Sequence, residues 1–283
     1  MNAFFISLSV VGISAQGALK KSFNGKTQGR GTLIFGSVSV LFACLFFLVS
    51  SGFKLDFNPE ILPYALGFAL SYGTATVAGF LAIKLGALSL TSLISSYSLI
   101  IPTLFGLIFL EERANVFFFI GFFLLLVSLF LINSKVGELK ISLKWITAVI
   151  FAFLGNGICS VFQNVQQRIF QGRYKSEFMI SALLSVFVAL IVASLLTERP
   201  TIRLCLRKGA HLMALSGIAN GTVNLLVMIL ATRMGASVMF PVISAGGIIL
   251  SWCVSRFLYK ERLTAKQNLA LVFGICAVVL MNL

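Results

Sequence analysis

Apolar runs about twenty residues long follow one another along almost the whole chain, and they limit the possible folds more than any other feature. About 20 apolar residues in a helix cross the roughly 30 Å hydrocarbon core of a bilayer. No water reaches the backbone there, so each run must form a helix or part of a closed barrel. Continuous runs without strand-like alternation predict helices. Ten runs are expected, over residues 2–19, 31–50, 61–83, 87–110, 115–133, 144–166, 178–196, 211–232, 236–257 and 266–282.

The composition agrees with a membrane protein. Of the 283 residues, 59% are hydrophobic and 11% are charged, whereas soluble domains have roughly 45–50% apolar and 25% charged residues. The formal net charge of +14 would suggest a nucleic-acid partner in a soluble protein. Here the basic residues stand at the ends of apolar runs, where they anchor the topology. We therefore predict an all-α, multi-pass protein of the inner cell membrane, with membrane lipid and no nucleic acid as a partner.

Two short motifs recur at the same distance along the chain. Gly86-Ala87 returns as Gly235-Ala236, and Glu112-Arg113 returns as Glu261-Arg262 after the same number of residues. This repetition predicts two units of five helices, at residues 1–134 and 135–283. Because five is odd, the second unit would enter the membrane inverted. Inverted repeats are typical of secondary transporters, which bind their substrate between the repeats near the midplane of the bilayer.

The order of Gly-Ala turn, apolar helix, Glu-Arg pair and final apolar helix resembles the drug/metabolite transporter superfamily, in its EamA-like branch. The resemblance covers nearly the whole chain as two EamA-like five-helix repeats. It implies a transporter of small molecules such as amino acids, other metabolites, nucleotide sugars or drugs, often in the outward direction. The motifs are diffuse, so they indicate an architecture and no particular substrate.

The distribution of basic residues predicts the orientation in the membrane. Most of the 22 Lys and Arg residues fall on the side opposite the N-terminus, and short cytoplasmic loops carry the excess of Lys and Arg. This count places both termini outside. The resemblance implies cytoplasmic termini instead. We give the charge count more weight because the loops are short.

All eight acidic residues fall at or beyond the ends of the expected spans. Glu112 and Glu261 are predicted to cap the N-termini of the helices at 115–133 and 266–282, where the helix dipole favours a negative charge. Proton-coupled transporters commonly have a titratable carboxylate inside the membrane. Its absence favours movement driven by the substrate gradient over obligatory proton antiport.

Uncharged polar residues form stripes inside several spans. An unpaired amide in hydrocarbon costs several kcal/mol, so these residues must face protein or water. Two interpretations remain open: hydrogen bonds between helices, and the lining of a substrate cavity. The cavity candidates are Gln16, Tyr72, Ser95, Tyr97, Asn156, Gln163, Asn220, Asn224, Ser244 and Trp252.

Sequence motifs for catalysis or metal binding are lacking. The five cysteines show no CxxC spacing, and the one histidine, His211, lies at a helix edge. No phosphate-binding GxxxxGK[ST] motif occurs. We therefore expect no cofactor, no metal site and no enzymatic activity.

Four functions follow from these patterns. The favoured one is a secondary transporter, an exporter or facilitator, for a small neutral or zwitterionic metabolite such as an amino acid, acting by alternating access. A flippase for a lipid-linked headgroup would have a groove open to lipid. An intramembrane enzyme would need a convergent catalytic set. A non-transporting membrane scaffold would have a sealed interior with every amide paired. The sequence leaves the oligomeric state open, with a homodimer as one alternative.

Overall fold

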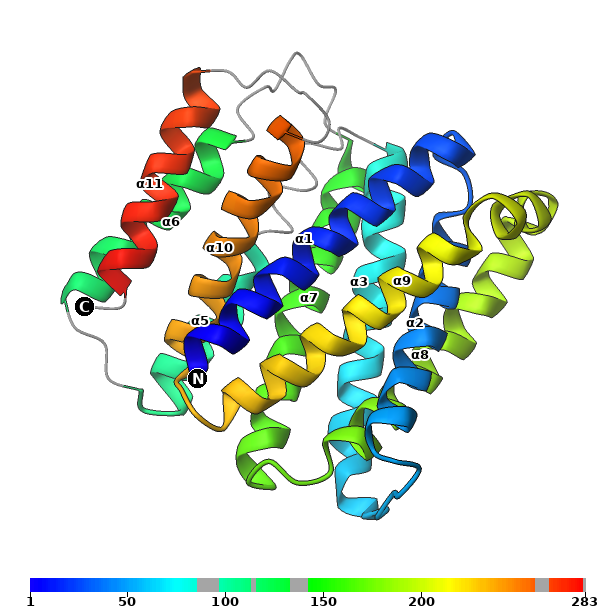
Figure 1. The fold of residues 1–283 in the computed structure, drawn as a ribbon, viewed down its shortest axis with the longest axis horizontal. Helices are drawn as coiled ribbons and strands as arrows, with labels where there is room; N and C mark the ends of the chain where they lie inside the picture. The colour runs from blue at the N-terminus through cyan, green and yellow to red at the C-terminus, as the bar shows by residue number, and fades with distance from the viewer. Residues whose placement is uncertain (86–96, 113–115, 133–141, 258–264, 282–283) are drawn as a thin grey trace.

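The computed structural model describes residues 1–85, 97–112, 116–132, 142–257 and 265–281 (Figure 1). Within these ranges the chain forms helices and no strand, which confirms the all-α class. The first part of the chain contains α1 (Asn2–Thr27), α2 (Thr32–Ser50), η1 (Pro59–Ile61), α3 (Leu62–Leu85), η2 (Tyr97–Leu99), α5 (Ile100–Phe109) and α6 (Val116–Ile132). The second part contains α7 (Leu143–Ile169), α8 (Lys175–Thr197), α9 (Arg199–Ala231), α10 (Ala236–Phe257) and α11 (Ala265–Met281).

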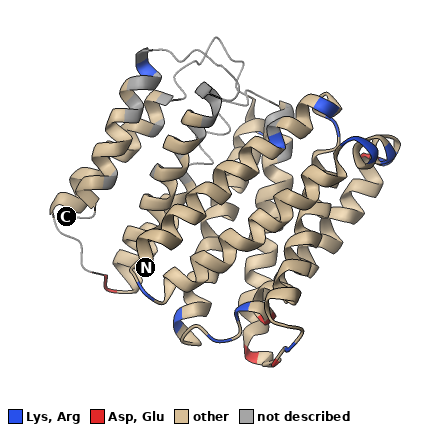
Figure 2. Ribbon diagram, viewed as in Figure 1, with Lys and Arg blue, Asp and Glu red and all other residues tan. Residues whose placement is uncertain are grey.

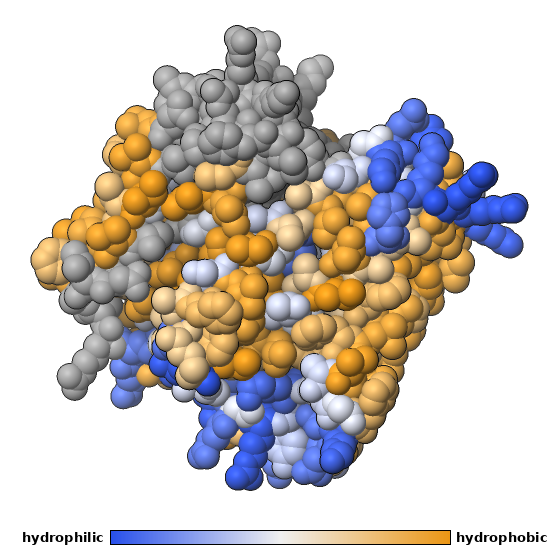
Figure 3. All heavy atoms as spheres, in the orientation of Figure 1, coloured by the Kyte–Doolittle hydropathy of each residue, from blue (hydrophilic) through white to orange (hydrophobic). Residues whose placement is uncertain are grey.

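Six helical segments of the described chain are long and apolar enough to cross a membrane: Asn2–Thr27, Thr32–Ser50, Pro59–Gly79, Leu143–Ile169, Lys175–Thr197 and Arg199–Ala231. Shorter apolar segments lie in α5, α6 and α11. Charged residues gather near the two ends of the helices in Figure 2, and the surface between them is mostly apolar in Figure 3. A chain with this distribution is compatible with a multi-pass membrane protein.

The helices pack in pairs that join the early and late parts of the chain. α3 packs along α7, α1 along α9, and α2 against both α8 and α9. α6 and α11 form a further pair at the left of Figure 1, with α10 beside α11. Among the described residues, a large apolar core lies between α2, α3 and α8, where Phe47, Phe68 and Phe178 are almost fully buried.

Two glycines allow helix backbones to approach closely. A Cβ at Gly217 in α9 would collide with the Ser39 carbonyl oxygen and with Phe42 in α2. A Cβ at Gly155 in α7 would lie 2.6 Å from the Ser71 carbonyl oxygen in α3. Small residues at such crossings are the usual means by which membrane helices associate, because lipid offers no hydrophobic driving force.

Two helices extend beyond the spans expected from hydropathy. α1 continues to Thr27 and α9 begins at Arg199, so the loops expected at 20–30 and 197–210 are mostly helical. The reason is packing: Phe23 from the end of α1 is buried with Cys205 and Leu212 of α9. Of the span expected at 87–110, the structure describes η2 and α5.

A distant carboxylate caps the N-terminus of α2. Glu198 precedes α9, is 7% exposed, and accepts hydrogen bonds from the backbone N–H groups of Leu33 at 3.1 Å and Ile34 at 2.9 Å. A negative charge at this end of a helix is favourable because the first N–H groups have no partner within the helix.

Candidate functional site

Four amide side chains form a continuous hydrogen-bonded chain across three helices. Gln163 of α7 donates to Asn224 Oδ1 of α9 at 3.1 Å, and Asn224 donates to Asn220 Oδ1 at 3.1 Å. Asn220 donates to Gln16 Oε1 of α1 at 3.2 Å. We call Gln16, Gln163, Asn220 and Asn224 the amide chain. All four are cavity candidates of the sequence, so residues far apart in the chain do come together.

Tyr72 joins this group from a fourth helix. Its side chain in α3 lies close enough to that of Asn220 for the two polar groups to interact, and its ring stacks on Phe68 with centroids 5.6 Å apart. The amide chain and Tyr72 therefore connect α1, α3, α7 and α9, and these helices also form the two long pairs described above.

Access to these polar groups is partial. Gln163 is buried. Gln16, Tyr72, Asn220 and Asn224 are half-buried, so part of each residue is exposed. In Figure 3, pale and blue atoms interrupt the apolar surface near the middle of the face shown. Amides within a helix bundle that remain partly accessible can exchange hydrogen bonds with water or a solute.

Two of the other candidates, Asn156 and Ser244, are described and are not part of this network. Asn156 lies two turns before Gln163 on α7, and its backbone carbonyl accepts bonds from Cys159 and Ser160. Ser244 lies on α10 and is half-buried. Ser95 and Glu261 lie outside the described residues, and of Tyr97 and Trp252 only the backbone is described.

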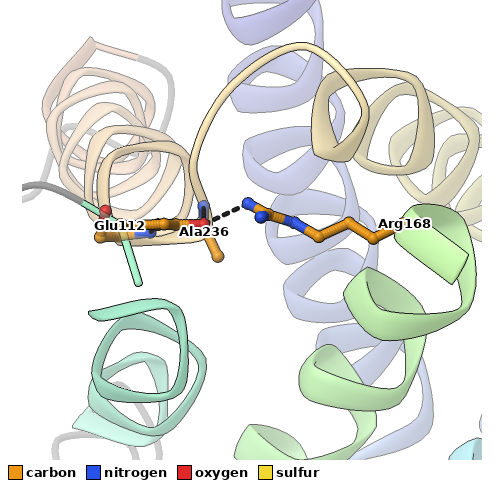
Figure 4. A network of polar contacts seen from close by, with 4 residues as sticks. Glu112, Arg168 and Ala236 are labelled. Atoms are coloured by element: carbon orange, nitrogen blue, oxygen red, sulfur yellow. Dashed lines mark hydrogen bonds and ion pairs between the residues drawn. The ribbon is translucent and has the colours of Figure 1, made fainter. Parts of the chain in front are cut away.

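Glu112 is a helix cap, but of a different helix from the one expected. Instead of capping the helix that follows it, α6, its carboxylate lies at the N-terminus of α10 (Figure 4). Oε1 accepts a bond from the backbone N–H of Ala236 at 2.9 Å, and Oε2 accepts one from Ser237 at 2.8 Å. The local sequence beside an apolar run carries no information on this contact, because only the tertiary packing brings the start of α10 to Glu112.

Arg168, at the end of α7, forms an ion pair with the same carboxylate. Partial burial alone raises the pKa of Glu112, but the bonds from Ser237 and Ala236 and the charge of Arg168 outweigh this effect and hold the pKa below its ordinary value. We call Glu112, Arg168, Ala236 and Ser237 the Glu112 latch. It links the segment after α5 to α7 and α10.

Several polar atoms near the latch are buried without a hydrogen-bond partner in the described structure. They are Nδ2 and Oδ1 of Asn164, Oε1 of Gln167 and Nε of Arg168, all on α7. The Ser194 hydroxyl, in the last turn of α8 and thus away from the latch, is a further such atom. None of these residues was among the cavity candidates of the sequence. The spacing of Asn164 and Arg168, one turn apart, was the signal that could have revealed them.

An apolar groove of about 780 Å³ lies between α3, α7 and the middle of α8. Its lining includes Leu70 and Leu85, which are 75% and 44% exposed, and among the described lining residues Lys144 is the one that carries a charge. The groove is therefore on the apolar surface of the molecule, separate from the latch.

Comparisons with known proteins found a similar fold and no matching family. No family model and no curated protein matches the chain. A solved structure, described only as the crystal structure of a protein, is similar with a TM-score of 0.79 over 99% of this chain and 95% of its own. The two sequences are 12% identical, so the likeness concerns the fold alone.

Proposed function

We propose that this chain is a secondary transporter of the drug/metabolite transporter superfamily, in its EamA-like branch, with ten spans arranged as two inverted five-helix repeats. The observation that carries this proposal is the amide chain with Tyr72. Uncharged polar side chains from four helices converge between the two halves, and four of them remain partly accessible. Such a set suits a small solute with both hydrogen-bond donors and acceptors.

The packing pattern supports the repeat. If α1, α2 and α3 correspond to α7, α8 and α9, the contact of α3 with α7 has its counterpart in that of α9 with α1. The contact of α2 with α9 likewise corresponds to that of α8 with α3, and α1 with α10 corresponds to α7 with α5. An exchange of halves that preserves neighbours is the expected result of an internal two-fold relation.

In this proposal the two halves rock about the amide chain, and the solute gains access to each side in turn. Binding redistributes the two conformations only to the extent that the solute binds them with different affinity. The Glu112 latch ties the segment after α5 in the first half to α7 and α10 in the second, so it holds one end of the molecule closed.

A sealed scaffold fits the described residues less well. It would have every buried amide paired, yet both polar atoms of Asn164 are buried without a partner. Leaving such groups unsatisfied costs about 1–3 kcal/mol each. A protein with no need to open would gain stability by replacing that asparagine with an apolar residue.

The test combines ligand screening with transport. The purified chain is screened against metabolites for a rise in melting temperature, because a ligand stabilises the state that it binds. Counterflow of the best ligand is then measured in proteoliposomes for the wild type, Asn220→Leu and Thr222→Val. Thr222 is on the same helix, and within the described part of the chain its hydroxyl donates to the backbone carbonyl of Ile218, one turn earlier.

We expect Asn220→Leu to lower counterflow about 5- to 10-fold, because a lost hydrogen bond to the solute costs roughly 1–1.5 kcal/mol. The melting temperature should change little, because hydrogen bonds between membrane helices contribute about 0.6 kcal/mol on average. Thr222→Val should resemble the wild type. If the loss of transport in Asn220→Leu merely follows a loss of folded protein, the amide chain is a packing device and the proposal fails.

A second candidate, a flippase for a lipid-linked headgroup, is favoured by the groove between α3, α7 and α8. The groove is open on the apolar surface and lined by aliphatic side chains, so it suits an acyl or prenyl chain. Vesicles that contain the protein and a fluorescent phospholipid test it. Faster movement of the lipid between leaflets, lost in Gly73→Phe within the groove, would favour the flippase over the solute transporter.

A further inference from the structure

Arg168 has more hydrogen-bond donors than partners. A guanidinium carries five N–H groups. The described structure shows one terminal nitrogen of Arg168 donating to Glu112, while its Nε is buried and has no partner. A cation that is only partly satisfied in this way has capacity for a second acceptor, and a planar guanidinium matches the two oxygens of a carboxylate.

Glu112, in contrast, does not depend on Arg168. Its two oxygens accept backbone N–H groups from Ala236 and Ser237 at the N-terminus of α10. These bonds would remain if Arg168 turned away. The ion pair between Glu112 and Arg168 can therefore break without leaving the carboxylate unsatisfied, and Arg168 is free to take another acid in its place.

The neighbouring side chains on α7 have hydrogen-bonding groups that could receive the ammonium group of an amino acid. Gln167 and Arg168 follow Asn164 by three and four positions, so all three share one face of the helix. Asn164 has one donor and one acceptor without partners, and Gln167 has one such acceptor. The donors suit a carboxylate, and the two amide oxygens suit an ammonium group.

The charge around the latch favours an anionic group. Lys175, in the first turn of α8, lies near enough to Arg233 for the two cations to repel each other, and the Lys175 ammonium donates to the Gly172 carbonyl. Arg233, two residues after the end of α9, lies over the Phe5 ring at 5.1 Å from its centroid. Within the described part of this cationic region, the carboxylate that pairs with Arg168 is that of Glu112.

We propose that Arg168 binds the carboxylate of a zwitterionic solute, with Asn164 and Gln167 receiving its ammonium group, and that Glu112 takes the place of this carboxylate when the site is empty. This inference rests on the proposed transport function and specifies the class of substrate. Because the unpaired atoms of Asn164, Gln167 and Arg168 have no access to solvent in the structure, the solute enters only after Glu112 has released Arg168.

The test is a thermal-shift titration of the purified full-length protein with alanine, valine, leucine and phenylalanine, each compared with its carboxamide and with its decarboxylated amine. We expect at least one amino acid to raise the melting temperature while its carboxamide and amine do not. Arg168→Gln and the charge-preserving Arg168→Lys should raise the half-saturating concentration about 10- to 100-fold, the loss expected for a hydrogen bond to a charged group. If Arg168→Gln fails to fold, the half-saturating concentration of Arg168→Lys is the measurement that tests the proposal.

Two further variants sharpen the result. Glu112→Gln removes the competing charge and should lower the half-saturating concentration, an effect opposite in sign to that of the Arg168 variants. Arg173→Gln is the matched control, because Arg173 is an exposed cation in the next loop, and it should bind as the wild type does. A purely structural ion pair would be weakened alike from either partner and would not produce opposite effects.

The outcomes separate this inference from the transport proposal. Equal stabilisation by carboxamides, unchanged binding in both Arg168 variants, or no shift with any amino acid overturns the inference. Counterflow of a solute without a carboxylate would overturn it as well, while leaving the transporter intact. Carboxylate-dependent binding through Arg168 without any counterflow would preserve the inference and remove the transport function.

Discussion

With one carboxylate, Glu112 connects parts of the molecule that are distant in sequence. It accepts hydrogen bonds from the first residues of α10 and pairs with Arg168 at the end of α7. The amide chain acts differently, since its members are uncharged and each donates to the next. At the scale of single residues, the structure thus contains a charged contact at one end of the helices and a neutral network among them.

The charged contact predicts a dependence of stability on pH. The pKa of Glu112 is lowered in the folded protein from its ordinary value of 4.5. Its carboxylate therefore contributes stability that is fully present above this value and is lost as the pH falls through the folded pKa. The melting temperature of the wild type should fall more steeply than that of Glu112→Gln between about pH 5 and pH 3. Parallel curves for the two proteins would show that the carboxylate does not stabilise the fold.

The four amides were among the ten cavity candidates of the sequence because amides are rare in apolar spans and must find partners, but the sequence did not indicate that these four bond to one another. It identified Glu112 as a cap from its position beside an apolar run. It could not identify the helix that is capped, because Ala236 and Ser237 are about 125 residues away in sequence. Contacts of this kind depend on tertiary packing, for which the local pattern carries no information.

Helices α1 and α9 show how an element can exceed its hydropathy signal. α9 has 33 residues, which correspond to about 50 Å, well beyond the thickness of a hydrocarbon core. Charged residues such as Arg203 and Arg207 end the apolar run early, yet helix continues through them because Cys205 and Gly209 pack on α1. Hydropathy located the apolar segments and gave the helix ends with less accuracy.

The crossing of α9 and α2 gives a prediction at this scale. Gly217→Val places a branched side chain where the Ser39 carbonyl and Phe42 already lie, and such overpacking costs about 1–3 kcal/mol. Gly17→Ala is the control, because nothing lies within 4 Å of its added Cβ, and alanine favours a helix by up to about 1 kcal/mol. We expect a lower melting temperature for the first variant and an equal or higher one for the second. A neutral Gly217→Val would mean that α9 and α2 separate easily.

At the scale of the whole molecule, the two ends differ in charge, and this difference predicts orientation. Cys205 cannot report it, because its thiol is fully buried against Gly31 and would resist reagents from either side. Exposed positions serve instead: Lys208 at one end and Lys54 at the other. In a cysteine-free background, Lys54→Cys should react with an impermeant maleimide on spheroplasts, and Lys208→Cys should react only after lysis. The reverse pattern would place the termini in the cytoplasm.

The placement of charge also bears on energy coupling. A proton carrier needs a pKa near ambient pH, whereas Glu112 is held in its charged form by two backbone N–H groups and Arg168. We predict that counterflow in proteoliposomes persists without a pH gradient and carries no stoichiometric proton flux. A fixed proton-to-substrate ratio that disappears in Glu112→Gln would show that this carboxylate carries the proton.

The cap on α2 has a consequence for the order in which the protein is made. Leu33 and Ile34 leave the ribosome long before Glu198, from which they are separated by 165 and 164 residues. Until the C-terminal end of α8 has been synthesised, the first N–H groups of α2 lack their acceptor. The same holds in the other direction for Glu112, which is translated before the α10 residues that it caps. Each half of the chain therefore completes its helix caps only when the other half is present. A nascent chain released before Glu198 is synthesised would insert α2 into the membrane without its cap.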